Sequence, residues 1–92
     1  MSAVVRRTLE VVNERGLHAR AATKLVHLAS RFDAEVTLEK DGQRANAKSV
    51  MGVLLLCGSM GTQVDVEAEG ADAADAVEAI ATLFADRFGE EQ

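Results

Sequence analysis

The chain of 92 residues has no proline, tryptophan or tyrosine, three phenylalanines and a single cysteine. One cysteine cannot form an internal disulfide, which fits a reducing compartment. With so few aromatics, aliphatic side chains and alanine must fill the core. The longest unbroken apolar run, residues 53–57, is too short to span a membrane, and the first ten residues lack a signal-peptide layout. We therefore expect one soluble cytoplasmic domain over residues 1–92, without membrane insertion.

The net charge of −5 conceals an asymmetry along the chain. Residues 1–62 contain nine Lys or Arg and six Asp or Glu, a net charge of +3, whereas residues 63–92 contain one and nine, a net charge of −8. The basic residues are scattered and no aromatics accompany them for base stacking, which argues against nucleic-acid binding. An anionic ligand or partner on the basic part of the chain is compatible with this distribution.

Hydrophobic spacing predicts four strands and three helices in the order β-α-β-β-α-β-α. Apolar alternation marks the strands, and spacings of three and four mark the helices. Because the strands have one apolar and one polar face, we expect an α+β domain with an antiparallel sheet and all helices on one side. The expected elements are a strand at 5–12, a helix from Arg20, a hairpin of strands 34–39 and 45–47 around Asp41-Gly42, a short helix between Ser49 and Gly58, a strand at 63–68, and a helix from its cap Asp72 to Phe88, ended by Gly89.

His18 lies at the predicted start of the first helix, after Gly16, which permits a close backbone approach. Free backbone N–H groups and the helix dipole favour an anion there and disfavour a charged imidazolium. His18 could therefore be a nucleophile that accepts a phosphoryl group, with Arg20 binding the phosphate. From composition alone, a plain polar residue in the cap region is the favoured interpretation, since a lone histidine near a helix start is common.

Other candidate ligands do not form a pattern. His27 is nine residues beyond His18, which places it on the opposite side of the helix, and Cys57 has no CxxC companion. We expect no metal site, a solvated His27 and a buried Cys57. No glycine-rich loop is present to cradle a ligand, so no cofactor is expected.

Two segments carry a resemblance to a known family. "GLHARAA" resembles the active-site signature of the HPr family, the histidine-containing phosphocarriers of the bacterial phosphoenolpyruvate-dependent phosphotransferase system, and "KSVMGVLLL" resembles the family's regulatory-serine segment. The resemblance extends from Thr8 to about Phe88. It implies an open-faced β-sandwich, a four-stranded antiparallel sheet covered on one face by three helices. The chain departs from the family at Ala21, where proline is usual.

The resemblance also implies roles for single residues. His18 matches the residue phosphorylated on Nδ1 by enzyme I and discharged to an enzyme IIA domain, and Arg20 matches the arginine beside the phosphate. Ser49 matches the serine modified by an HPr kinase/phosphorylase. The protein would then be a monomeric carrier on which enzymes act, rather than a stand-alone catalyst.

The segment after Ser49 has more apolar residues than a short helix can bury. Helical spacing directs Val53 and Leu56 to the core, so that the other apolar residues become candidates for docking to a partner, with Gly52 giving a partner's backbone room. A regulatory interaction module controlled through phosphorylation of Ser49 is the alternative to a phosphocarrier. The predicted docking residues are Val50, Met51, Gly52, Leu54 and Leu55.

Overall fold

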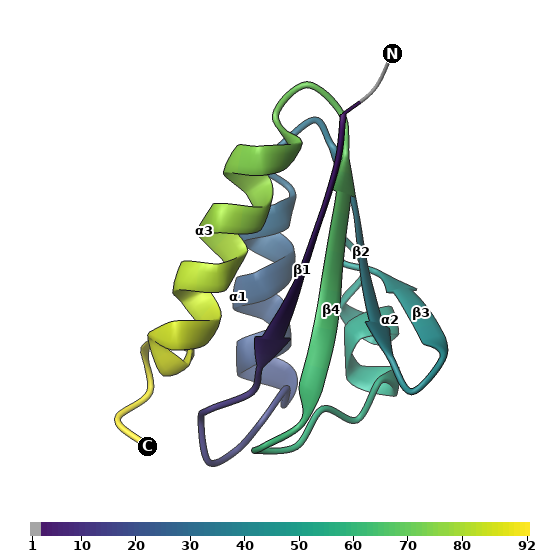
Figure 1. Ribbon diagram of the computed structural model, residues 1–92. Helices are drawn as coiled ribbons and strands as arrows, with labels where there is room; N and C mark the ends of the chain where they lie inside the picture. The colour runs from purple at the N-terminus through teal and green to yellow at the C-terminus, as the bar shows by residue number, and fades with distance from the viewer. Residues whose placement is uncertain (1–2) are drawn as a thin grey trace.

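The computed structural model describes residues 3–92, and it confirms the predicted element order and fold class. Figure 1 shows a sheet with α1 and α3 packed on one side of it, while α2 lies beside the hairpin of β2 and β3. No helix among residues 3–92 is long and apolar enough to cross a membrane. The elements are β1 (Val4–Glu10), α1 (Ala19–Ala29), β2 (Glu35–Lys40), β3 (Gln43–Asn46), α2 (Val50–Leu55), β4 (Gln63–Glu69), α3 (Ala73–Ala85) and a 3₁₀ turn, η1 (Arg87–Gly89).

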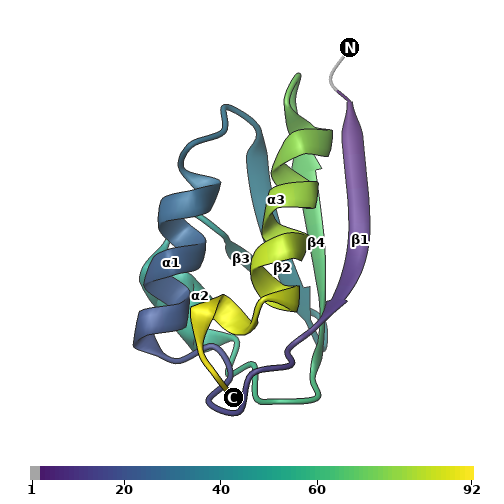
Figure 2. The same ribbon diagram turned by 90° about the vertical axis from the view of Figure 1, so that its left-hand side faces the viewer.

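The four strands form one antiparallel sheet in the order β1-β4-β2-β3. The central strand β4 pairs with both β1 and β2, and in this register Leu38 and Val66 lie side by side. Val64 and Val66 on β4 are completely buried beneath the helices. Viewed from the helical side, α1 and α3 run across this face of the sheet (Figure 2). The alternation of apolar and polar residues thus sorts each strand into a covered face and an open face.

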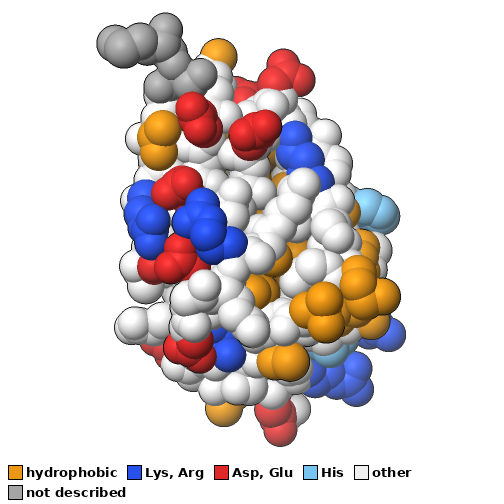
Figure 3. Space-filling model, turned by 90° about the vertical axis from the view of Figure 1, so that its right-hand side faces the viewer, with side chains coloured by type: hydrophobic (Ala, Val, Ile, Leu, Met, Phe, Trp, Pro, Cys, Tyr) orange, Lys and Arg blue, Asp and Glu red, His pale blue; other side chains and the backbone are white. Residues whose placement is uncertain are grey.

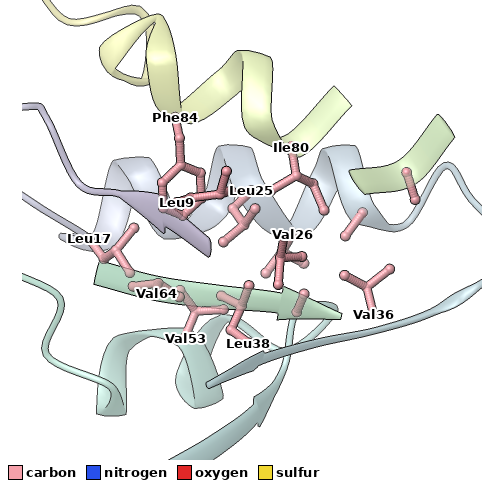
Figure 4. Close-up of a cluster of buried hydrophobic side chains, with 14 of the residues drawn as sticks. Leu9, Leu17, Leu25, Val26, Val36, Leu38, Val53, Val64, Ile80 and Phe84 are labelled. Atoms are coloured by element: carbon pink, nitrogen blue, oxygen red, sulfur yellow. The ribbon is translucent and has the colours of Figure 1, made fainter. Parts of the chain in front are cut away.

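Both layers supply the side chains of a single core. Leu9, Leu38 and Val64 from the strands pack with Leu25 from α1 and Phe84 from α3 (Figure 4). Burial of a side chain of this size stabilises the fold by roughly 1.5–3 kcal/mol. As the sequence predicts, aliphatic residues and alanine provide most of the core.

The open face of the sheet carries a network of charges, seen as alternating blue and red side chains in Figure 3. The Arg6 guanidinium lies 3.0 Å from the Asp65 carboxylate and 3.1 Å from that of Glu67. Arg44 pairs with Glu39 at 2.8 Å and with Glu67 at 3.1 Å. Hydrogen bonds from Thr8 and then Arg6 hold the pKa of Asp65 below its usual value. These side chains satisfy one another's hydrogen-bonding capacity and keep the open face of the sheet polar.

The last helix differs from the sequence prediction at both ends. Asp72 precedes α3, but its side chain does not cap that helix. Its carboxylate instead accepts the backbone N–H groups of Asp33 and Ala34, at 2.9 and 2.8 Å, and the Asp33 hydrogen bond is the main cause of its lowered pKa. At the other end α3 stops at Ala85. Phe88 is not part of α3: it lies in η1, where its side chain is buried.

A close backbone crossing joins the segment before α1 to the segment after α2. The Leu17 N–H donates to the Gly58 carbonyl oxygen at 2.7 Å. Gly16 has a φ of +67°, and a β-carbon there would collide with that same carbonyl. A β-carbon on Gly58 would come within 2.7 Å of the Leu17 side chain. Glycine is therefore required at position 16, whereas a side chain at position 58 would force the Leu17 side chain to move.

Gly16→Ala should destabilise the fold more than a glycine substitution that adds only backbone strain. Gly42→Ala is the matched control, because Gly42 also has a positive φ, +83°, but no atom lies within 4 Å of its would-be β-carbon. We expect a loss of about 1 kcal/mol of unfolding free energy for Gly42→Ala and at least about 2 kcal/mol for Gly16→Ala. Urea unfolding of both variants measures the difference, and equal losses would show that the crossing is not tightly packed.

Candidate functional site

His18 is the N-cap of α1, with φ −75° and ψ 180°, as the sequence predicts. Its Nδ1 accepts a hydrogen bond from the Arg20 backbone N–H at 3.3 Å. The first helical hydrogen bond runs from the Ala22 N–H to the His18 carbonyl oxygen at 2.8 Å. Ala21 is thus the third residue of the helix, in the turn where backbone N–H groups have no helical acceptor, so the backbone there accommodates alanine or proline equally.

The other ring nitrogen of His18 contacts a residue that the sequence analysis did not identify. Nε2 lies 2.5 Å from Oε2 of Glu90, whose side chain is 14% exposed. The second oxygen of that carboxylate accepts from Nδ2 of the buried Asn13 at 3.1 Å, and the same Nδ2 donates to the Gly16 carbonyl at 2.8 Å. The hydrogen bond with His18 is the main cause that holds the pKa of Glu90 below its usual value.

Glu90 reaches His18 because the chain reverses after α3. Arg87, Phe88 and Gly89 have φ values of +56°, +55° and +78° in succession. The Phe88 ring packs against Phe84 with centroids 4.9 Å apart, and Lys24 Nζ donates to the Phe88 carbonyl at 2.6 Å. Gly89 signals the end of the helix in the sequence, but no local pattern shows where the residue after it will lie.

Arg20 is exposed, and its guanidinium makes no hydrogen bond or ion pair within residues 3–92. It lines a surface depression together with Arg15 and the carboxylates of Glu14, Glu90 and Glu91. An anion on Nδ1 of His18 would meet the Arg20 backbone N–H, and the Arg20 side chain has no other partner in the described chain. This arrangement is suited to an anionic group such as a phosphoryl group.

Ser49 caps α2, and its Oγ accepts the Gly52 N–H at 3.1 Å. Met51 and Leu55 are 66% and 67% exposed, whereas Val53 and Leu56 are buried as predicted. Val50 and Leu54 are half-buried against the core. We define the apolar patch as these four residues on one helix: Val50, Met51, Leu54 and Leu55. Figure 3 shows hydrophobic side chains gathered beside α2.

The docking role of Gly52 stays a prediction: the residue is half-buried, and a β-carbon on it would lie 3.5 Å from the Ala45 β-carbon and 3.3 Å from Ser49 Oγ. The expected burial of Cys57, by contrast, is wrong. Cys57 is exposed rather than buried. Cys57 lies just after α2 and has a φ of +54°, and the buried residue at this point is the following Gly58.

The remaining candidate lies apart from this site. His27 is exposed in the last turn of α1, as the sequence predicts. Within residues 3–92, no three side chains of His, Cys, Asp or Glu come together in a way that could hold a metal ion. The residues that do come together are His18, Arg20 and Glu90, next to the segment that follows α2.

Comparison with known proteins agrees with this geometry. The family model described as "PTS HPr component phosphorylation site" matches residues 5–86. The phosphocarrier protein HPr of Xylella fastidiosa strain Temecula1 is 47% identical over 83 residues, which cover 90% of this chain and 93% of that protein.

Among solved structures, HPr-C-His from Thermoanaerobacter tengcongensis superposes with a TM-score of 0.92 at 42% identity, covering 96% of this chain and 99% of the other. An HPr dimer from the same organism gives a TM-score of 0.76 at 43% identity, with 89% and 94% covered. These matches extend over nearly the whole of this chain and of each relative. The chain therefore belongs to the HPr family of phosphocarriers.

Proposed function

We propose that the protein accepts a phosphoryl group on His18 Nδ1 from phosphorylated enzyme I and passes it to an enzyme IIA domain. The observation that carries this proposal is the position of Nδ1 at the cap of α1, 3.3 Å from the Arg20 N–H. Membership of the HPr family supports the same assignment. In this role the protein is the substrate of two enzymes, and it works as a monomer that presents one site to each in turn.

The site offers both parts of the reaction. A ring nitrogen with a free electron pair can attack phosphorus, and Nδ1 is held with its electron pair toward the helix start. The N–H groups of the first turn and the guanidinium of Arg20 can then bind the phosphoryl oxygens. Because Arg20 has no competing partner within the described chain, its charge is available to the phosphate.

The apolar patch is the proposed docking surface for both enzymes. Met51 and Leu55 are the most exposed apolar residues of α2, and the Leu17–Gly58 crossing ties the end of that helix to the loop before His18. An exposed apolar patch next to a reactive side chain is suited to a transient interface. We infer that acidic groups surround the matching surface of the partner, since nine of the ten basic residues of this chain lie in its first 62 residues.

His18→Ala should fold normally and carry no phosphate, because a half-exposed ring contributes little packing. The measurement is intact mass before and after acid treatment, on protein incubated with phosphoenolpyruvate and a cognate enzyme I. We expect the wild type to carry one acid-labile phosphate. His27→Ala serves as the control and should be labelled like the wild type. A label on His18→Ala, or its loss from His27→Ala, would contradict the assignment.

Arg20→Ala should slow transfer from phosphorylated enzyme I about tenfold or more, equivalent to about 1.4 kcal/mol, by removing a charged partner of the phosphate. Arg20→Lys should recover only part of the rate, since an ammonium lacks the planar fork of a guanidinium. Rapid-mixing kinetics measure the rates, with the exposed Arg31→Ala of the same segment as a control. Equal rates for wild type and Arg20→Ala would remove Arg20 from the site.

A second, regulatory role is proposed for Ser49. Its side chain caps the helix that carries the apolar patch, so a phosphate added there by an HPr kinase/phosphorylase would place about −1.5 to −2 charges beside the docking surface. A negative charge at this position would repel an acidic partner, and its hydration would oppose the burial of the neighbouring apolar side chains. If this regulation dominated, the protein would act chiefly as an interaction module controlled through Ser49.

Ser49→Asp should weaken binding to enzyme I at least about tenfold without lowering the melting temperature, because aspartate is also a good N-cap. Ser49→Ala should bind nearly normally but lose about 1 kcal/mol of stability with the cap. Calorimetric titration and thermal melts of both variants separate the two effects. Normal binding by Ser49→Asp would leave Ser49 as a cap alone.

A further inference from the structure

The contacts on the two sides of the His18 ring determine which nitrogen carries the proton. The Arg20 N–H donates to Nδ1, so Nδ1 must present an electron pair. Glu90 faces Nε2, and the low pKa of Glu90 keeps its carboxylate ionised near neutral pH, where it can only accept hydrogen bonds. The neutral tautomer with the proton on Nε2 satisfies both contacts, and the tautomer with the proton on Nδ1 satisfies neither.

We propose that Glu90 is a positioning residue for phosphoryl acceptance, which keeps the proton on Nε2, directs the phosphoryl group to Nδ1 and stabilises the charge that the ring then acquires. This inference rests on the phosphoryl-acceptor role proposed for His18. It adds a residue that no feature of the local sequence identifies, 72 positions away from the histidine along the chain.

The charge balance of the reaction explains why a carboxylate on Nε2 is useful. The Nδ1 electron pair forms the new N–P bond, while the bond between phosphorus and the donor breaks and its electron pair leaves with the donor. The proton stays on Nε2, and the ring, which has given up an electron pair, becomes positively charged. The Glu90 carboxylate then lies next to a cation rather than a neutral ring, so its attraction is stronger in the product and in the transition state than before the reaction.

Several contacts from different parts of the chain hold Glu90 in place. A positive φ is costly for a residue other than glycine, and Arg87 and Phe88 both adopt it, three and two positions before Glu90. Burial of Phe88 and the Lys24 hydrogen bond to its carbonyl fix the reversed chain. Asn13, which is fully buried, orients the second carboxylate oxygen. Backbone strain next to a reactive side chain, fixed by several independent contacts, is typical of a functional site.

The tautomer can be tested without any partner protein. Long-range ¹H–¹⁵N correlation spectra of the full chain report which nitrogen of His18 carries the proton. We expect a single Nε2–H form in the wild type and a mixture of both forms in Glu90→Ala. Glu90→Asp keeps the two carboxylate oxygens on a shorter side chain and should restore part of the preference. Glu91→Ala is the matched control, since Glu91 is an exposed neighbour of equal charge.

The regiochemistry of phosphorylation provides the second readout. Phosphoramidate, a small-molecule donor, transfers its phosphoryl group as its P–N bond breaks and ammonia leaves. In ³¹P spectra we expect only Nδ1-phosphohistidine in the wild type and in Glu91→Ala. Glu90→Ala should react at Nδ1 about tenfold more slowly, as expected for loss of a hydrogen bond to a charged group, and should also form the Nε2 product.

Each result is decisive for the proposal. The proposal would be overturned if Glu90→Ala kept the Nε2–H tautomer and formed only the Nδ1 product at the wild-type rate. A lower melting temperature in that variant would not rescue it, because Glu90 would then only hold the end of the chain in place. Formation of the Nε2 product by the wild type would overturn it as well. If the tautomer and the product depend on Glu90 but enzyme I does not phosphorylate the wild type, positioning by Glu90 holds and the proposed partner is wrong.

Discussion

The close contact between Gly16, Leu17 and Gly58 determines how the site is assembled. Gly16 and Leu17 precede α1, and Gly58 follows α2. The Leu17 N–H donates to the Gly58 carbonyl oxygen at 2.7 Å, and this hydrogen bond holds the two segments together. His18 follows directly, so the orientation of its ring depends on the crossing. The crossing also links the end of α2, which carries the apolar patch, to the loop before His18. Two elements far apart in sequence thereby form one surface.

The parts of the site that obey local rules could be predicted from the sequence. His18 and Ser49 are helix caps, and a cap is recognised from the few residues that follow it. Spacing along α2 distinguished the buried Val53 from the exposed Leu55, because a helix directs side chains by position alone. The alternating strands gave the covered and open faces of the sheet for the same reason. Resemblance to the HPr family added the chemical interpretation of His18.

The features that escaped prediction depend on contacts between distant segments. Asp72 has the residue type and position of a helix cap, yet two backbone N–H groups from the turn before β2 compete for its carboxylate and bind it. Glu90 is one of several acids in an acidic tail, and only the reversal of the chain after α3 selects it. Cys57 was expected to be buried as a small apolar residue, but it follows α2 with a left-handed backbone and is exposed. In each case the deciding partner or backbone angle lies outside the local pattern.

The reversal after α3 also has a practical consequence for labelling and purification. The Glu14 N–H donates to the Gln92 carbonyl at 2.9 Å, so Gln92 lies against the loop that precedes His18. Ala3, by contrast, lies at the far end of the sheet, next to Gly70 (Figure 1). A fluorophore, an affinity tag or a fusion partner attached after Gln92 would lie beside the proposed phosphoryl-acceptor site. The same group placed before Ala3 would leave that site open, so measurements of transfer and binding should use chains extended at the amino end.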